Sequence, residues 1–491
     1  MSHNVSERAA AAAEGARRNA QRAAADPGRP GYHFMPPSGW MNDPNGTLYH
    51  DGFYHLFYQH NPYHERWDAI HWGHARSRDL LHWEHLPPAL IPATSDGEAG
   101  CWSGACVVPE GERPLILYSS QRLDPGPLSG GAVNRIEQRF ARGDEQLLDW
   151  RQGSEDALPY PQRAGGPAVT PDWRDPYVFT SGDRTGLVIA ARSDDDAWDA
   201  LVLLYEAEDS GLSRWRYRGV LYRRPLSEIR FFECPNLFRL GESWILLASP
   251  YGPVHYYIGT LDFDAPAFEP VAWGILDEGP SFYATNTFFT PDNRTIVVGW
   301  ISGFPEGRGW NGCLSLPREV SLGDTGTLRQ APARELRELR VAHSQFEDLR
   351  VSGEPWRSPS FDRSMLELSM RIRFPGSSRL RVVAEGQTSG RRVELLSIDP
   401  EEVGSGDIRA LRAQRSAGDP DEEGASLHVF WDRSVLEIFA DGGRKAITRV
   451  VEAAEEPQRL ELHADGGAVT IPELNVWTLR EAVHKTWREQ Q

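Results

Sequence analysis

The sequence lacks any apolar run long enough to span a bilayer, and it has few cations for its size. Its 491 residues include 52 Lys and Arg against 70 Asp and Glu, a formal net charge of −18, and Lys445 and Lys485 are the only lysines. This surplus of negative charge disfavours nucleic acid and anionic membranes as partners. A neutral small molecule such as a sugar is compatible with it.

Cysteine is scarce as well. Cys101, Cys106, Cys234 and Cys313 are too few for a disulfide framework in so long a chain, although a Cys101–Cys106 bridge stays open. A signal peptide is also missing, because no aliphatic core follows the alanine-rich start. We therefore expect residues 1–30 to be a helical extension and the protein to be cytoplasmic. Whether this helix or a later domain mediates homo-oligomer formation is left open.

Histidines do not indicate a metal site. His71, His74, His82 and His85 alternate with Trp and Arg on predicted strands, and no second group of ligand residues matches them in spacing. We expect no bound metal.

Turn-forming residues and tryptophan, by contrast, are abundant. The chain has 46 Gly, 36 Pro and 17 Trp, which is typical of short strands joined by tight turns, so we expect an all-β fold. A repeat supports this, because a polar residue, a short strand, a tight turn and a second apolar strand recur five times. The leading polar residues are Asp43, Ser103, Asp175, Glu233 and Thr287.

These units, which begin 60, 72, 58 and 54 residues apart, predict a five-bladed β-propeller over residues 31–331. The first strand of each blade would start near the central axis, so the leading side chains would share one funnel. A β-sandwich with coincidental spacing is the alternative. We expect a linker of one or two helical turns at 332–345, a separate β-sandwich at 346–480, and a polar, helical tail at 481–491.

Three acidic side chains occupy similar places in this pattern. Asp43 lies in Trp-Met-Asn-Asp-Pro-Asn-Gly (40–46), Asp175 in Arg-Asp-Pro (174–176), and Glu233 in Glu-Cys-Pro (233–235). The first motif has turn chemistry, since Pro sets φ, Asn and Asp bond the local backbone, and Gly permits a positive φ. An ordinary turn is the alternative for each motif alone. Together, we expect the three carboxyl groups to converge.

Two carboxyl groups about 5–5.5 Å apart can cleave a glycosidic bond with retention, one attacking the anomeric carbon and the other protonating the leaving oxygen. We expect Asp43, in the tightest turn, to be the nucleophile. Glu233 has a longer reach and an apolar flank at 231–232 that favours its protonated form, which suits the acid/base role. Asp175, kept ionised by Arg174, would stabilise the charge of the transition state.

The three motifs resemble the signatures of glycoside hydrolase family 32, the invertase and fructanase family. The likeness covers residues 32–479 in family order. It includes Tyr-Gln-His-Asn-Pro (58–62), Trp-Gly-His-Ala (72–75), Trp-Ser-Gly (102–104), Phe-Tyr-Ala (282–284) and Glu-Ile-Phe (437–439).

This resemblance implies a five-bladed propeller followed by a β-sandwich, and retaining hydrolysis of β-D-fructofuranosides without a cofactor. It implies the same roles for Asp43 (nucleophile), Asp175 (stabiliser) and Glu233 (acid/base). The fructose contacts that it implies are Asn42, Gln59, Trp67, Trp102, Ser103, Arg174 and Tyr283.

One position departs from the family pattern. Members commonly have Asp after Glu-Cys-Pro, and here Asn236 removes a charge near Glu233, which leaves the pH optimum open. Three functions remain: a β-fructofuranosidase acting on sucrose and short fructo-oligosaccharides, a fructosyltransferase on the same scaffold, and a carbohydrate-binding protein without turnover. The presence of all three acids disfavours the last. Sucrose, sucrose phosphate and fructans are not ranked by the sequence.

Overall fold

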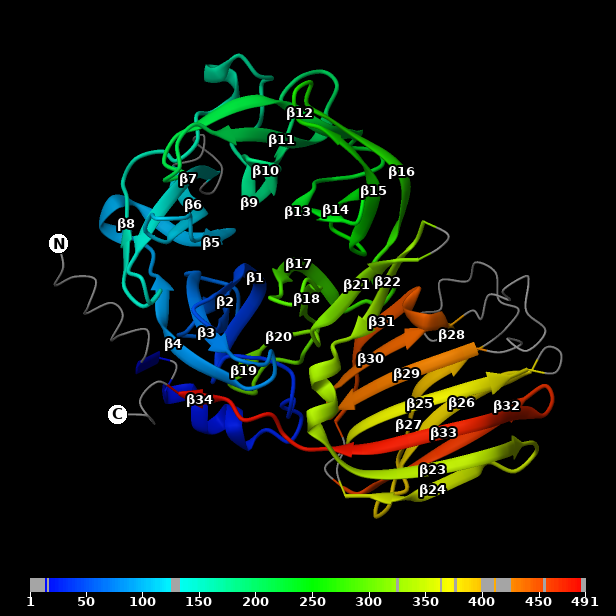
Figure 1. Cartoon of the computed structure of the whole chain (residues 1–491). Helices are drawn as coiled ribbons and strands as arrows, with labels where there is room; N and C mark the ends of the chain where they lie inside the picture. The colour runs from blue at the N-terminus through cyan, green and yellow to red at the C-terminus, as the bar shows by residue number, and fades with distance from the viewer. Residues whose placement is uncertain are drawn as a thin grey trace.

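The computed structural model describes residues 14–15, 17–124, 133–323, 326–362, 364–374, 378–398, 410–411, 425–453 and 456–486. Within these ranges strands dominate, which confirms the predicted all-β class (Figure 1). No helix there is long and apolar enough to cross a bilayer. The expected N-terminal helix lies partly outside the described residues. The helical parts are 14–15, 17–25, and the short 3-10 helices η1 (Thr94–Asp96), η2 (Pro161–Ala164), η3 (Arg334–Leu339) and η5 (Asp441–Gly443).

Residues 39–332 form five sheets, and the four main strands of each sheet follow one another along the chain. Tight turns make these neighbours antiparallel; at Asp51-Gly52, for example, φ is 47° and 78°. The strands are β1 (Gly39–His50), β2 (Phe53–Asn61), β3 (His71–Ser77), β4 (Trp83–Leu90); β5 (Glu98–Val107), β6 (Leu115–Asp124), β7 (Val133–Gly143), β8 (Trp150–Gln152); β9 (Arg174–Ser181), β10 (Arg184–Arg192), β11 (Asp199–Ala207), β12 (Trp215–Pro225); β13 (Glu233–Leu240), β14 (Ser243–Ser249), β15 (His255–Asp262), β16 (Ala267–Ile275); and β17 (Phe282–Phe289), β18 (Thr295–Ile301), β21 (Arg318–Leu322), β22 (Leu328–Pro332), with β20 (Cys313–Leu314) beside β18 and β19 (Trp310–Asn311) beside β1.

The five sheets close into a ring. The inner strands β1, β5, β9, β13 and β17 each contact the next, and β17 contacts β1 (Figure 1). Buried apolar side chains fill the space between neighbouring sheets; Val188 and Val202 of the third sheet, for example, share a core cluster with Leu237 and Leu246 of the fourth. This packing leaves the inner strands facing a common axis, where polar side chains from different sheets meet.

Each inner strand carries an irregularity near its first residues. The pairing register shifts between Met41 and Pro44 in β1, and comparable shifts occur in β5, β13 and β17 and opposite β9. Asp175 and Cys234 have positive φ, 66° and 48°. Bulges of this kind turn side chains away from the regular pleat. They therefore aim side chains from five strands at the axis.

Two expectations about local structure were wrong. Residues 40–46 do not form a turn before a strand but lie within β1, because the chain absorbs its turn-forming residues as bulges. At Gly46, φ is 51°, and a Cβ would lie 2.7 Å from that of Cys106. The fifth unit also begins earlier than Thr287, at Phe282, so Tyr283 takes the place expected for Thr287.

The C-terminal part consists of two packed sheets around one apolar core. Its first strand begins at Arg340, before the expected boundary at 346, directly after η3. The tail was predicted to be helical, but β34 (Lys485–Thr486) pairs with β4, and 487–491 lie outside the described residues. The strands are β23 (Arg340–Val351), β24 (Trp356–Phe361), β25 (Met365–Arg373), β26 (Arg379–Gly386), β27 (Arg392–Ile398), β28 (Ala410–Leu411), β29 (Ala425–Asp432), β30 (Val435–Ala440), β31 (Lys445–Val450), β32 (Gln458–Asp465) and β33 (Val469–Leu479).

A buried group of charged side chains joins the ring to the C-terminal sheets; we call His33, Asp277, Arg318, Asp432 and Glu437 the junction cluster. Arg318 donates to Glu437 (Nη2–Oε2, 2.6 Å) and to Asp277 (Nη1–Oδ2, 2.8 Å). His33 bridges Asp432 (2.8 Å) and Glu437 (3.0 Å) through its two ring nitrogens. All five side chains are inaccessible to solvent. The cluster thus joins segments about 400 residues apart by charge-assisted hydrogen bonds.

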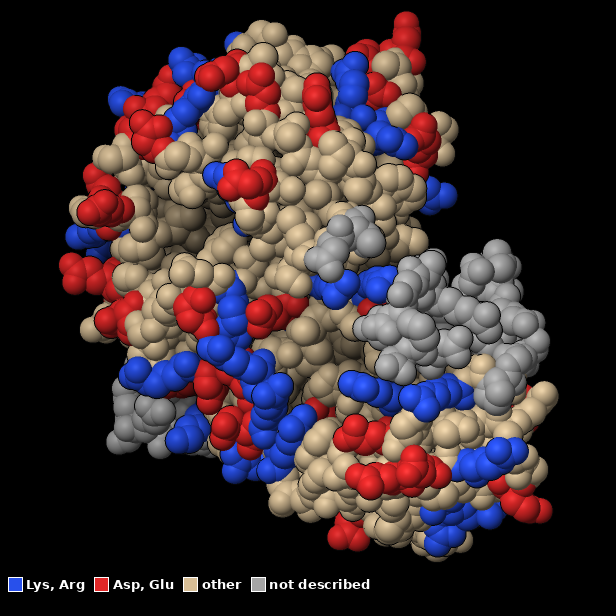
Figure 2. Space-filling model, turned by 45° about the vertical axis from the view of Figure 1, so that its right-hand side comes forward, with Lys and Arg blue, Asp and Glu red and all other residues tan. Residues whose placement is uncertain are grey.

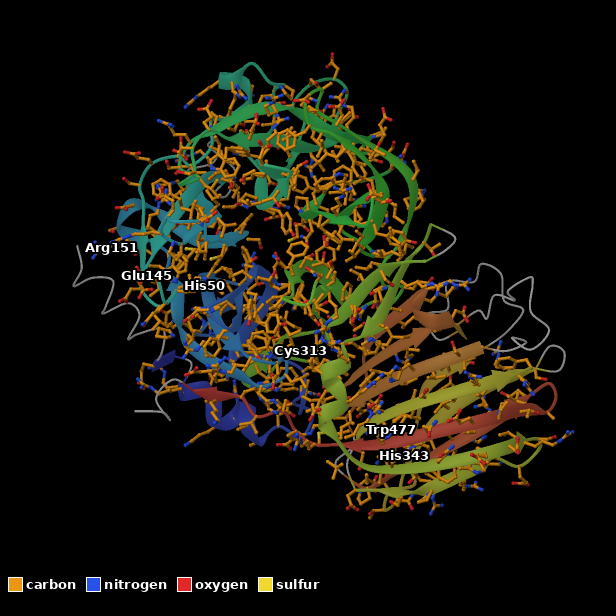
Figure 3. All side chains as sticks on the ribbon, in the orientation of Figure 1. His50, Glu145, Arg151, Cys313, His343 and Trp477 are labelled. Atoms are coloured by element: carbon orange, nitrogen blue, oxygen red, sulfur yellow. The ribbon has the colours of Figure 1, made fainter. Side chains whose placement is uncertain are left out.

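All four cysteines are free and buried, so Cys101 and Cys106 are not bridged. Cys313 lies close to the junction between the ring and the C-terminal sheets (Figure 3). Among the side chains drawn in the same view, many fill the spaces between the strands and others project outward.

Candidate active site

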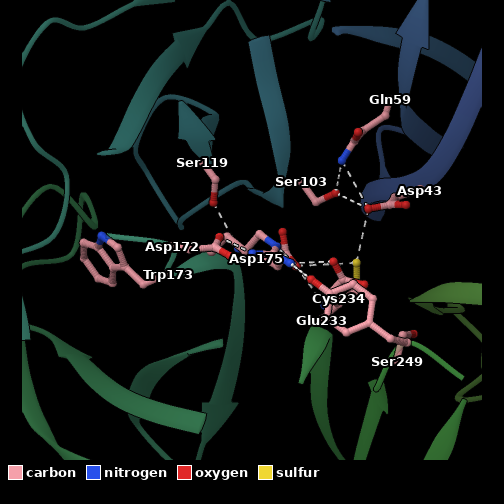
Figure 4. A network of polar contacts seen from close by, with 12 residues as sticks. Asp43, Gln59, Ser103, Ser119, Asp172, Trp173, Asp175, Glu233, Cys234 and Ser249 are labelled. Atoms are coloured by element: carbon pink, nitrogen blue, oxygen red, sulfur yellow. Dashed lines mark hydrogen bonds and ion pairs between the residues drawn. The ribbon is translucent and has the colours of Figure 1, made fainter. Parts of the chain in front are cut away.

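The three acidic side chains singled out by the sequence meet at the ring axis (Figure 4). The thiol of Cys234 lies 3.3 Å from Asp43 Oδ2 and 3.9 Å from Asp175 Oδ2, so one sulfur touches both carboxylates. Arg174 in turn touches Asp175 and Glu233. We call Asp43, Arg174, Asp175, Glu233 and Cys234 the axial cluster. On the face seen in Figure 2 the ring is hollowed near its centre, bordered mostly by uncharged residues.

Asp43 is held by four donors. Asn42 Nδ2 donates to Oδ1 at 3.0 Å, and Gln59 Nε2, Ser103 Oγ and Cys234 Sγ donate to Oδ2 at 3.1, 2.5 and 3.3 Å. Donors converging on both oxygens stabilise the ionised form and fix its orientation. Burial, together with the nearby carboxylates, raises the pKa of Cys234, so its thiol keeps the hydrogen that it donates.

Asp175 lies in a different environment. It is buried, and its Oδ2 accepts the Cys234 backbone N–H at 3.0 Å. Burial raises its pKa to about 7; Arg174 lowers it in part, while Glu233 and Asp43 raise it further. Arg174, whose Nε lies 3.8 Å away, therefore does not keep Asp175 fully ionised at neutral pH, because burial and like charges oppose it.

Arg174 is closer to Glu233 than to Asp175. Its Nη2 donates to Glu233 Oε1 at 2.6 Å, and its Nη1 contacts Asp172. The guanidinium carbon lies 4.2 Å from the ring centroid of Phe231, so the apolar neighbour expected to flank Glu233 packs on Arg174 instead. Phe232 belongs to the core between the third and fourth sheets. Glu233 thus sits beside a cation and not in an apolar pocket.

Tyr283 completes the surroundings of Glu233. Its hydroxyl contacts Glu233 Oε2 and lies 2.9 Å from the Ser249 carbonyl oxygen, and it accepts the Tyr251 backbone N–H at 3.0 Å. A phenol has one hydrogen to donate. That hydrogen can go to Glu233 Oε2 or to the Ser249 carbonyl oxygen. The two carboxyl oxygens of Glu233 are thus held by Arg174 and Tyr283.

The two tryptophans lie at the edge of this network. Trp102 precedes Ser103, and the Arg174 guanidinium carbon lies 5.8 Å from its ring centroid. Trp67 packs edge-on against Trp102, with 5.8 Å between ring centroids, and is 46% exposed. Trp102 is partly buried and packs against the core between the second and third sheets, whereas Trp67 is half exposed. The structure thus brings together all ten residues that the sequence analysis selected: Asn42, Asp43, Gln59, Trp67, Trp102, Ser103, Arg174, Asp175, Glu233 and Tyr283.

Sequence reasoning missed two contributors. Cys234 was counted only among four cysteines too few for a disulfide framework, although its place between Glu233 and Pro235 put it next to the acids. Tyr251, half exposed at φ 60°, accepts a hydrogen bond from Arg174 Nη2 at 2.5 Å. No sequence signal marks it. Asn236, the departure from the family pattern, is buried and bonds the carbonyls of Cys234 and Thr285 and the hydroxyl of Thr287.

Known proteins resemble this chain over nearly its whole length. A sucrose-6-phosphate hydrolase of Escherichia coli is 30% identical over 480 residues, which cover 92% of this chain and 94% of that protein. A raffinose invertase of Escherichia coli is also 30% identical, over 92% of this chain and 95% of its own. The crystal structure of a family 32 β-fructofuranosidase from Bombyx mori superposes with a TM-score of 0.78 at 27% identity, covering 96% of this chain and 99% of that one.

Two family models match as well. The glycosyl hydrolases family 32 N-terminal domain matches residues 33–332, and the family 32 C-terminal model matches 405–478. The first match alone covers more than half of the chain and contains the whole axial cluster. This chain therefore belongs to glycoside hydrolase family 32.

Proposed function

We propose that this protein hydrolyses terminal non-reducing β-D-fructofuranosides, such as sucrose and short fructo-oligosaccharides, with retention of configuration. One observation carries the proposal: Asp43, Asp175 and Glu233 converge at one end of the ring axis, linked by Cys234 and Arg174. A retaining glycosidase needs a carboxylate that acts as nucleophile and a second carboxyl group that acts as acid/base.

In the first step, Asp43 attacks the anomeric carbon of fructose. A bond forms between a carboxylate oxygen and that carbon, while the bond from the carbon to the leaving oxygen breaks. The four donors around Asp43 support this role, because they hold the carboxylate in one orientation. The product of this step is a covalent fructosyl-enzyme.

Glu233 gives its proton to the leaving oxygen in the same step. The placement of Glu233 supports this role, since Arg174 and Tyr283 hold its two carboxyl oxygens beside the other two acids. In the second step Glu233 takes a proton from water, the hydroxide joins the anomeric carbon, and Asp43 is released. The sugar product is fructose in the β configuration.

Asp175 and Arg174 would hold the fructose hydroxyls. Asp175 carries an acceptor whose bonds strengthen as positive charge develops on the ring. Gln59, Asn42 and Ser103 would complete the polar side of the pocket. Trp67 and Trp102 supply apolar faces for the C–H surface of the sugar.

We also propose that the ring is a five-bladed β-propeller, with the β-sandwich as a second domain. The closed succession of inner strands β1, β5, β9, β13 and β17 supports the first point. The continuous core shared by the two C-terminal sheets supports the second. The propeller domain would span 31–331, and the sandwich would begin at Arg340.

The test is a product assay with sucrose and 1-kestose followed by NMR. Free fructose, released first as the β anomer, supports the proposal; an α product would reject the retaining mechanism. At high sucrose concentration, trisaccharides in place of free fructose would identify a fructosyltransferase on the same scaffold. Binding of sucrose without any product would leave only a carbohydrate-binding role.

A further inference from the structure

The indole of Trp67 has few contacts of its own, although Asn61 Nδ2 donates to the carbonyl of the preceding residue, Arg66, at 2.9 Å. Trp67 lies on the loop between β2 and β3, is 46% exposed, and its ring contact among the described residues is with Trp102. A half-exposed indole on a loop would be free to leave the site unless something fixes the loop backbone. The residue two positions earlier does this.

Glu65 is an unusual loop residue because it is 6% exposed and its carboxylate faces backbone, not solvent. Oε1 accepts the Gly307 N–H at 2.9 Å, and Oε2 accepts the N–H groups of Arg308 and Gly309 at 2.9 and 2.7 Å. Gly307 and Gly309 have φ of 91° and 84°, conformations that aim successive N–H groups at one anion. Charge-assisted bonds from three consecutive residues tie the Trp67 loop to the loop before β19.

The N-terminal helical segment 17–25 supports the same two loops. Asn19 Nδ2 donates to the Tyr63 carbonyl at 3.3 Å, and Arg22 Nη2 lies 3.5 Å from Glu65 Oε1. On the other loop, a Cβ at Gly309 would lie 3.0 Å from the Asn19 carbonyl oxygen. Loop and helix contacts therefore converge on Glu65.

We propose that Glu65 is a positioning residue, which holds the indole of Trp67 against Trp102 as a wall of the sugar pocket. This inference rests on the proposed function. It assigns Glu65 no contact with substrate; its effect passes through Trp67 alone. A misplaced wall weakens binding of the sugar more than it slows bond cleavage. We therefore expect the change mainly in the Michaelis constant KM and not in kcat.

The experiment compares wild type, Glu65→Gln, Trp67→Ala and the double variant with sucrose. In Glu65→Gln, one oxygen becomes an NH₂ group facing backbone N–H donors. We expect KM to rise about tenfold, with kcat within about twofold. In the Trp67→Ala background the same change should raise KM less than about twofold, because the residue that Glu65 positions is gone. Glu306→Gln is the matched control, since its ion pair with Arg66 joins the same loops at an exposed site.

Two outcomes overturn the inference. One is an unchanged KM in a folded Glu65→Gln protein; the other is the same rise with and without Trp67, which would mark a general structural role. Should Glu65→Gln fail to fold, Glu65→Asp keeps the charge but cannot reach all three N–H groups, and the same cycle is run with it. If wild type cleaves no β-fructoside at all, the proposed function fails, and that result is distinct from an unchanged KM.

Discussion

Two arginines, Arg174 and Arg318, each stand among buried carboxylates, yet their clusters differ in charge balance. In the junction cluster, Arg318 and His33 face Asp277, Asp432 and Glu437, so two cations meet three anions. Burial alone would raise the pKa of Glu437, but Arg318 and His33 lower it instead. Each charge there has a direct partner.

In the axial cluster the single cation, Arg174, touches Asp175 and Glu233, and Cys234 links Asp43 to Asp175. Burial and the surplus of negative charge raise the pKa of Asp175 to about 7. The comparison teaches that similar groups serve different ends: the junction side chains are inaccessible to solvent, whereas the Glu233 side chain is 18% exposed. The balanced charges of the junction cluster join two parts of the chain. The unbalanced charges of the axial cluster raise the pKa of a carboxyl group toward neutral pH, a range useful for catalysis.

The largest expected effect comes from a substitution in the axial cluster. Asp43→Asn should lower turnover at least a thousandfold, about 4 kcal/mol in activation free energy, because the nucleophile is lost. The protein should stay folded, since Asn keeps the size of Asp and one of its two acceptor oxygens. Fructose release and thermal unfolding measure the two quantities. Residual activity well above a thousandth of wild type would remove Asp43 from the role.

Breaking the junction cluster should have the opposite signature. Glu437→Gln places an amide NH₂ against the donors of Arg318 and leaves that buried cation undercompensated, so we expect a loss of about 3–5 kcal/mol in unfolding free energy. Turnover per folded molecule should stay near wild type. Denaturant unfolding and activity at low temperature check this. Glu319→Gln, which breaks a half-exposed pair with Arg294, is the control and should cost about 0–1 kcal/mol.

The junction cluster should also make stability depend on alkaline pH. Burial alone lowers the pKa of His33, but its hydrogen bonds to Asp432 and Glu437 raise it to about 9. Protonation of His33 therefore stabilises the fold fully below pH 6.5, and this contribution, about 3 kcal/mol, is lost as pH rises through 9. Melting temperatures between pH 6 and 10 measure it. In His33→Gln the decline should flatten; an unchanged slope would assign it to other groups.

A smaller expected effect tests whether Glu233 is the general acid. Glu233→Gln should reduce activity on sucrose about a hundredfold more than on an aryl β-fructofuranoside, because a good leaving group needs little protonation. Rates on both substrates measure the difference. Equal losses would mean that Glu233 is not the general acid. Tyr283→Phe, which removes the hydroxyl beside Oε2, should give a smaller difference of the same sign.

Much of the site could be read from residue types and order. Asp43, Asp175 and Glu233 each precede or open an apolar strand, so a ring of such strands was bound to bring them together. The local conformation was not readable, because Asn-Asp-Pro-Asn-Gly forms a turn in isolation and a bulged strand when β2 and Cys106 pack against it. Long-range pairings override local turn preference once the strand has partners on both sides.

The ion-pair partner of Arg174 is a second feature that the sequence did not predict correctly. Sequence adjacency suggested Asp175, but consecutive residues in a bulged strand point apart, and Glu233 from the next sheet lies closer. Tyr251 and Glu65 likewise act across sheets or loops, through contacts that no local pattern encodes.

By itself the sequence determined the strand-rich class, the five-fold repeat and the identity of the acids, because these follow from side-chain periodicity and turn chemistry over short stretches. Tertiary structure alone decided which cation pairs with which acid, how far the pKa of Asp175 is raised, and what fixes Trp67. Those properties depend on distances of a few ångströms and on burial, and both are set only when segments far apart in the chain pack together.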